Sequence, residues 1–425
     1  MLFSKEKYNF EKLYKYSFLL LAFVLPLSKA IISLLSVFVF LLWILEGNYK
    51  EKFLLIKRNQ ILIVLISFIT LSYLSFLWSD DVTLKSIVDS DYKYLLFIPL
   101  FYTVLKKEWL EQIITAFLAG MFISEIISYG MYFGFWQTSH GTAFDPTPFM
   151  NHIQYSVFLA FSAILLFSRI LSKKTTLIEK IVTVPFFLTV IGNLFITGGK
   201  TGQVSFLIAI IVLFAIHYRI NIRTIMISFF SIILIVLLAY TNSNTFNSRI
   251  NTAVSSFKNL YEQKDFSSTI GLRASYYLLV NDILSEDISK LVFGVGKNDA
   301  QKEINMMIEN KKNSEYKNYN LRIEFLEKNL THNQYLEILL EIGLIGLFLF
   351  LYFFYLIFKN LTLNSEVSEI FLLFLTVYLI SMIFDMIMKT QFTRTLFILF
   401  VSIGIVDIQY NKQYNKQELK KNIEA

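Results

Sequence analysis

The chain alternates between long apolar runs and short polar segments, and this pattern predicts a bundle of membrane-spanning helices. The runs that are long enough, or nearly so, to cross a bilayer fall near residues 15–30, 31–45, 61–78, 93–105, 112–135, 152–171, 180–197, 201–217, 223–240, 333–358, 368–388 and 391–408. The fourth run is short, and the first two form a tight hairpin around Pro26. We therefore expect an all-α polytopic membrane protein with about 12 transmembrane helices.

The composition agrees with this class. Hydrophobic residues make up 55% of the 425 residues and charged residues only 17%, and a soluble chain of this length would carry far more charge. The net charge of +7 does not indicate nucleic-acid binding, because Lys and Arg gather in short loops between apolar runs. The chain has no cysteine, which excludes disulfides and Cys-based metal sites. We expect membrane lipids as partners and no nucleic acid.

The basic loops predict the sidedness of the chain. With twelve spans, the loops that carry Arg58, Lys107 and Lys174 all fall on one side, which the positive-inside rule makes cytoplasmic together with both termini. One long polar segment then falls on the outer side, and it contains helix-like pieces on either side of Gly294-Val295-Gly296. The expected organisation is transmembrane helices 1–9 in residues 1–240, an outer cap loop in 241–331 between spans 9 and 10, helices 10–12 in 332–410, and a basic cytoplasmic tail in 411–425.

A histidine lies where the cap segment meets the tenth span. Thr331 followed by Gln334, just ahead of an apolar stretch, predicts a helix N-cap with a capping box. His332 would then lie in the first helical turn, where the positive end of the helix dipole disfavours imidazolium and leaves a neutral general base. The alternative is an interfacial histidine that hydrogen-bonds water or lipid.

Cationic residues fall on the same outer side. Lys200 follows two glycines at a helix start, an arrangement suited to anion binding, and Arg273 opens a helix-like stretch of the cap, where its guanidinium can form a phosphate fork. Arg249 and Arg322 are weaker candidates in the cap. Gly199-Lys200-Thr201 is no nucleotide-binding P-loop, because that motif needs glycine where the chain has Leu194.

The remaining candidates are secondary. His152 begins the sixth span, where substrate contact and hydrogen bonding between helices are both open. Glu341 lies two turns into the helix after His332, at a membrane depth where carboxylates usually face protein or water. Four scattered histidines give no metal-ligand spacing, and only the acidic pairs Asp80-Asp81 and Asp89-Ser90-Asp91 leave metal-dependent transfer open.

Several segments together resemble the O-antigen ligase and O-antigen polymerase superfamily. They are Thr197-Gly198-Gly199-Lys200-Thr201-Gly202, Arg273 with Tyr276 and Tyr277, Leu291-Val292-Phe293-Gly294-Val295-Gly296, and His332-Asn333-Gln334-Tyr335-Leu336 through Glu341-Ile342-Gly343-Leu344-Ile345-Gly346. The motif-bearing region runs from about 190 to 350, and the His332 stretch is its most specific part. Family members usually carry Arg where this chain has Lys200, and lysine lacks the bidentate fork.

The resemblance implies a metal-independent, nucleotide-independent, inverting glycosyltransferase of the bacterial inner membrane that works at its periplasmic face without a cofactor. Such enzymes take a glycan from an undecaprenyl-diphosphate carrier. A ligase places it on a lipid A-core sugar in lipopolysaccharide biosynthesis, and a polymerase places it on another carrier-linked repeat unit. The resemblance implies His332 as catalytic base, with Arg273 and Lys200 binding the diphosphate.

We favour the ligase, because the motifs occupy a single long loop followed by three spans. A polymerase and a protein O-oligosaccharyltransferase with a Ser or Thr acceptor remain open. A lipid-linked glycan flippase, from a different class, predicts charged residues lining the bundle interior, whereas this chain places its cations and His332 on one face.

Overall fold

The computed structural model describes residues 3–80, 82–218, 222–317, 319–327 and 331–424. Asp81, a member of a predicted acidic pair, lies outside these ranges. So do residues 1–2, 219–221, 318, 328–330 and 425 of the predicted segments. Throughout the described part the chain is helical or irregular, and its β-structure amounts to two isolated bridges. The predicted all-α class is confirmed.

The helices follow the predicted apolar runs closely. Before the cap they are α1 (Phe3–Val24), α2 (Lys29–Glu46), α3 (Tyr49–Lys57), α4 (Gln60–Leu74), α5 (Leu84–Val88), α6 (Phe97–Val104), α7 (Leu110–Tyr132), α8 (His152–Leu171), α9 (Leu177–Ile196), α10 (Lys200–Tyr218) and α11 (Ile222–Asn242). The cap segment forms α12 (Asn244–Gln263), α13 (Thr269–Glu286), α14 (Ile288–Phe293), α15 (Ala300–Lys311) and α16 (Ile323–Leu326). The chain ends with α17 (Gln334–Asn360), α18 (Glu366–Phe384) and α19 (Gln391–Glu424).

Within the described residues, nine helices are long and apolar enough to cross a membrane, or ten when a bent pair counts as one span, against the twelve predicted. Three predicted runs account for the difference. The first half of α1 is rich in charged residues, and the 93–105 run is divided between a 3-10 helix at Asp91–Leu96 and the eight-residue α6. The third run, in α11, qualifies only together with α12 across a bend of 105°.

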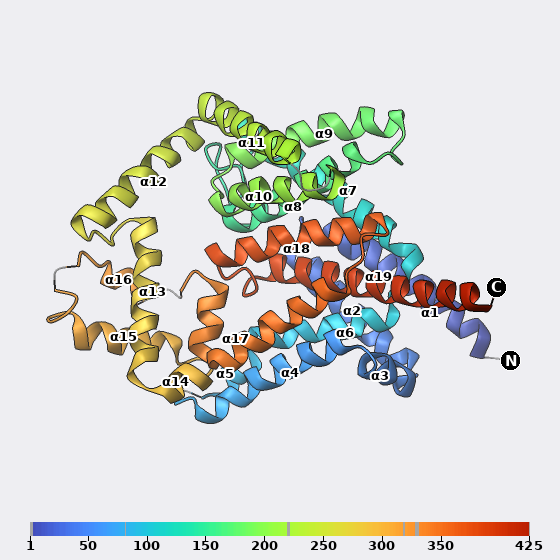
Figure 1. Ribbon diagram of the computed structural model, residues 1–425, viewed down its shortest axis with the longest axis horizontal. Helices are drawn as coiled ribbons and strands as arrows, with labels where there is room; N and C mark the ends of the chain where they lie inside the picture. The colour runs from blue at the N-terminus through green and yellow to red at the C-terminus, as the bar shows by residue number, and fades with distance from the viewer. Residues whose placement is uncertain (1–2, 81, 219–221, 318, 328–330, 425) are drawn as a thin grey trace.

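The long helices lie side by side along the longest axis of the molecule, and α12–α16 form a group at one end (Figure 1). Both chain termini lie at the opposite end, beyond α1 and α19 (Figure 1). The bundle core is dense in aromatic side chains, with the Phe161 ring 4.6 Å from Phe400 and 5.1 Å from Phe374. The cap has a separate cluster of buried side chains around Tyr276 and Ile304, which the start of α17 extends with Leu336 and Leu340.

The cap is attached to α17 through two glycine-containing turns. Gly343 interrupts α17 with a φ of +70°, a conformation that strains any residue with a Cβ. Just before this kink, the carbonyls of Leu340 and Glu341 accept hydrogen bonds from the N–H groups of Val295 (2.8 Å) and Gly296 (3.1 Å). The glycine motif of the cap therefore pairs directly with the glycine motif of the membrane helix.

Candidate active site

His332 precedes its helix instead of lying in the first turn. The prediction of a Thr331 N-cap is wrong: α17 begins at Gln334, and the side chain of Asn333 caps it by accepting from two backbone N–H groups. The Thr331 hydroxyl donates instead to the Glu337 carboxylate at 2.9 Å. His332 has a φ of +49°, a left-handed conformation that non-glycine residues seldom adopt and that turns the chain into the helix.

The imidazole of His332 is held on two sides. Its Nδ1 lies 3.2 Å from Oδ1 of Asp385, which directly follows α18, and its ring stacks on Phe325 at a centroid distance of 5.9 Å. When Nδ1–H donates to the carboxylate, Nε2 keeps its lone pair. Among the described residues no group hydrogen-bonds this buried Nε2. The arrangement leaves one nitrogen available to accept a proton.

Arg273 lies beside this pair. Its Nη2 donates to the Phe384 carbonyl at 3.1 Å, and its buried Nε finds no partner within the described part of the chain. Burial lowers the pKa of the Arg273 guanidinium, and the charge of Asp385 acts in the opposite direction. Arginine stays protonated under such shifts, so a positive charge with unused N–H donors lies next to His332–Asp385.

Lys200 and Arg249 extend the positive charge. Lys200 is the first residue of α10, and the charges of Arg249 and Arg273 both act on its ammonium group. A Cβ built on Gly198 would lie 2.5 Å from Arg249 Nη2, so the glycine leaves room for this guanidinium. Three cations from α10, α12 and α13 thus share one neighbourhood, a concentration of like charge that suits an anionic ligand.

His152 supports the turn before Lys200. Its Nδ1 lies 3.1 Å from Oδ2 of Asp145, and Oδ1 of Asp145 accepts from the Gly198 N–H at 2.7 Å. Burial favours a higher pKa for Asp145, but the hydrogen bonds from His152 and Gly198 and the charge of Arg249 hold that pKa below its ordinary value. The ionised carboxylate therefore ties α8 to the glycine turn.

The two other candidates lie differently. The Arg322 guanidinium sits 5.4 Å from the centroid of the Phe325 ring, the same ring that stacks on His332. Glu341 instead forms a buried ion pair with Lys297 and belongs to a separate polar cluster. The structure thus brings His332, Arg273, Lys200 and Arg249 together and places Glu341 apart from them.

Sequence reasoning missed Asp385 and Asp145. Asp385 had a visible signal, because it lies inside the apolar run 368–388 and carboxylates at membrane depth usually face protein or water. Asp145 lies in an ordinary polar loop, and neither its spacing nor its neighbours distinguish it.

Comparison with known proteins agrees with the motif pattern. Residues 185–351 match the model of the family described as O-antigen ligase, a region that includes Lys200, Arg273 and His332 but excludes Asp145 and Asp385. A search of curated proteins found no match. The resemblance predicted from the sequence is confirmed over this region: residues 185–351 of this multi-pass membrane chain are similar to the O-antigen ligase family.

Proposed function

We propose that the protein is an O-antigen ligase that transfers a glycan from undecaprenyl diphosphate to a sugar hydroxyl of lipid A-core, at the periplasmic face of the bacterial inner membrane. The observation that carries this proposal is the pairing of His332 with Asp385 beside Arg273. It supplies an oriented base with a free nitrogen next to positive charge. Lys200 and Arg249 add to that charge.

The proposed reaction inverts the anomeric carbon in a single displacement. As the acceptor oxygen bonds to the anomeric carbon, its proton passes to Nε2 of His332, and the bond from that carbon to the diphosphate oxygen breaks. Asp385 stabilises the imidazolium that forms, as a carboxylate does for a catalytic histidine. Arg273 and Lys200 stabilise the negative charge that develops on the leaving diphosphate.

We also propose that the reaction needs neither a metal ion nor a nucleotide, because fixed cations supply the charge stabilisation. Transfer from purified carrier-linked glycan is then expected to proceed equally with and without EDTA. Loss of transfer in EDTA, restored by added Mg²⁺ or Mn²⁺, would contradict this part of the mechanism.

For topology we propose cytoplasmic termini and a periplasmic cap. The cap and the two termini occupy opposite ends of the bundle (Figure 1). Termini at one end require an even number of crossings, which fits ten or twelve spans. Because the chain has no native cysteine, single cysteines introduced in α12 or near residue 415 would report sidedness by labelling with an impermeant maleimide. Labelling of both positions in intact spheroplasts would refute the arrangement.

The central test measures transfer of carrier-linked glycan to rough lipopolysaccharide, meaning lipid A with its core sugars. Loss of a positioned base lowers a reaction rate by about 10²–10⁴-fold, so the transfer rate of His332→Ala is expected to fall by that factor. Lys258→Gln, an exposed substitution in α12, serves as the control. Near-normal transfer by His332→Ala or Arg273→Ala at wild-type expression would remove that residue from the mechanism.

A deletion strain tests which acceptor is used. Free lipid A-core together with accumulated polymer on the carrier supports the ligase. Core that bears a single repeat unit would instead identify a polymerase, and unchanged lipopolysaccharide would refute both.

A further inference from the structure

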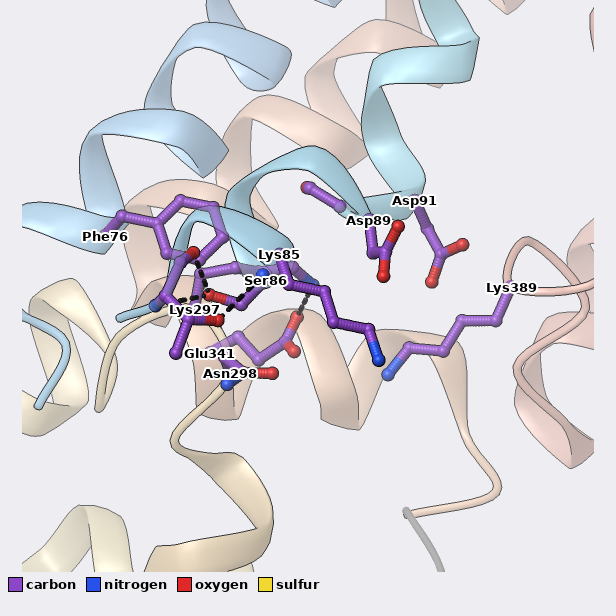
Figure 2. Close-up of a pocket in the computed structure, with 11 residues that line it drawn as sticks. Phe76, Lys85, Ser86, Asp89, Asp91, Lys297, Asn298, Glu341 and Lys389 are labelled. Carbon is purple, nitrogen blue, oxygen red and sulfur yellow. Dashed lines mark hydrogen bonds and ion pairs between the residues drawn. The ribbon is translucent and has the colours of Figure 1, made fainter. Parts of the chain in front are cut away.

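A polar cavity of about 340 Å³ has a lining that includes neither Lys200 nor Arg273, and Figure 2 shows the residues around it. Five parts of the chain contribute to its wall: Phe76 after α4, the segment 83–91, the turn before α15, α17, and the connection between α18 and α19. The polar side chains on which its chemistry depends are Lys85, Asp89, Asp91, Lys297, Asn298 and Lys389.

The charges around this cavity are balanced. Lys297 pairs with Glu341, Lys389 pairs with Glu337, and Asp91 pairs with Arg394. Figure 2 shows Lys85 and Lys389 extending toward one another and the carboxylates of Asp89 and Asp91 pointing into the same space. A balanced set of fixed donors and acceptors suits a neutral ligand with many hydroxyl groups better than it suits a phosphate or a cation.

Two side chains of the cavity are available to such a ligand. Lys85 and Asp89 are exposed, and neither forms an ion pair with any other described residue. Lysine supplies three N–H donors, and a carboxylate accepts from several hydroxyl groups. Together these two side chains offer the donor and acceptor combination that sugar rings require.

The cavity is coupled to His332 through one buried carboxylate. Oε1 of Glu337 accepts from Lys389 of the cavity wall at 2.6 Å, and Oε2 accepts from Thr331, the residue before His332, at 2.9 Å. The connection that begins with Asp385, the partner of His332, also carries Lys389. A ligand in the cavity therefore contacts a wall that hydrogen bonds connect to the residue before His332.

A more apolar groove of about 290 Å³ adjoins the cavity. It lies between α2, α6 and α19, and Arg394 lines it. Nη1 of Arg394 is 2.6 Å from Oδ1 of Asp91, so this ion pair separates groove and cavity. The neighbouring outward face of α2 exposes Leu34, Phe38 and Leu41, as a lipid-facing helix does.

We propose that the polar cavity is the acceptor site for a lipid-anchored saccharide, with sugars in the cavity and an acyl chain in the adjoining groove. This inference rests on the proposed ligase function and assigns its acceptor to a cavity whose lining includes none of the diphosphate-binding cations.

Binding measurements test the site without requiring transfer. Full-length protein in nanodiscs is titrated with rough lipopolysaccharide, with lipid A lacking core sugars, and with undecaprenyl diphosphate. Asp89→Asn and Lys85→Gln are each expected to weaken binding of rough lipopolysaccharide by about tenfold or more, since each removes a hydrogen bond with a charged group. Binding of the other two lipids should stay at the wild-type level. Glu262→Gln and Lys258→Gln, exposed in α12, are the matched controls.

Two results would overturn the proposal. The first is unchanged binding of rough lipopolysaccharide in both cavity variants. The second is a loss of undecaprenyl diphosphate binding as large as the loss of rough lipopolysaccharide binding, which would reassign the cavity to the donor. In transfer assays the cavity variants should raise KM for the acceptor and leave kcat nearly unchanged. If the wild-type protein shows no transfer activity and still binds rough lipopolysaccharide through Asp89 and Lys85, the ligase function is refuted and the saccharide site is retained.

Discussion

Replacing Asp385 with asparagine isolates the contribution of the carboxylate to the His332 base. The substitution keeps the size of the side chain and removes its charge. An amide can present either its oxygen or its nitrogen to Nδ1, so His332 loses its preference for the tautomer that leaves Nε2 free. The imidazolium formed during transfer also loses its counter-charge. We therefore expect kcat to fall while donor binding through Arg273 is largely retained.

The size of the effect follows from the geometry. A hydrogen bond to a charged group contributes about 1.5–3 kcal/mol. His332 Nδ1 and Asp385 Oδ1 lie 3.2 Å apart, and the two side chains are 31% and 19% exposed. Water therefore weakens the interaction, and the lower part of that range applies. About 1.5–2 kcal/mol corresponds to a fall of about 12- to 30-fold in kcat. Because Asp385 acts through His332, this loss must stay smaller than that of His332→Ala.

The assay compares single-turnover transfer to rough lipopolysaccharide in Asp385→Asn, His332→Ala and the double variant. Asp282→Asn is the control, since its carboxylate also accepts hydrogen bonds within the cap, from Tyr316 and Lys311. We expect the double variant to match His332→Ala. Folded Asp385→Asn protein with transfer within twofold of wild type, or a double variant much slower than His332→Ala, would refute the reasoning.

Three further predictions concern stability. Glu341→Gln should lower the free energy of unfolding by about 3–5 kcal/mol, because it leaves Lys297 buried and unpaired. Adding Lys297→Met should recover most of this loss. If the losses of the two substitutions simply add, the pairing is contradicted. Gly343→Ala should abolish the monodisperse peak in size-exclusion chromatography, since its Cβ would lie 2.3 Å from a carbonyl of α14; Gly47→Ala, at a φ of +69° with open space around it, should retain the peak. Asp145→Asn should lower the unfolding temperature at pH 7. Because the pKa of Asp145 is lowered by folding, its stabilisation is full above about pH 4 and disappears as pH falls through the lowered pKa, so the two proteins should converge in acid; a gap that widens in acid would exclude this origin.

The membrane helices were predictable because apolar length alone specifies them. The sequence therefore locates α8, α17 and α18 within a few residues. It does not show that the 93–105 run breaks into short pieces, because that depends on packing against α4 and α19. The local sequence pattern also does not distinguish two good capping residues, because Thr331 and Asn333 both favour the N-cap. In the structure the Thr331 hydroxyl hydrogen-bonds Glu337, and Asn333 caps the helix.

The candidate site was predictable to a similar extent. Motif and sidedness single out His332, Arg273 and Lys200, and the structure places them in one neighbourhood. The acids that orient them could not be chosen from sequence. Asp385 and Asp145 come from connections outside the motif region, and only the packing of α18 and α8 brings them to their partners.

The hydrogen bonds that join the Val295–Gly296 turn to α17 bear on how related enzymes can be recombined. They connect backbone atoms 45 residues apart, as Val295 N–H to Leu340 O and Gly296 N–H to Glu341 O. The buried Lys297–Glu341 ion pair adds a side-chain contact to this junction, so cap and helix must match there as well as in both glycine turns. A chimera that exchanges the cap should therefore take its boundaries beyond Gly343, so that cap and helix come from the same parent.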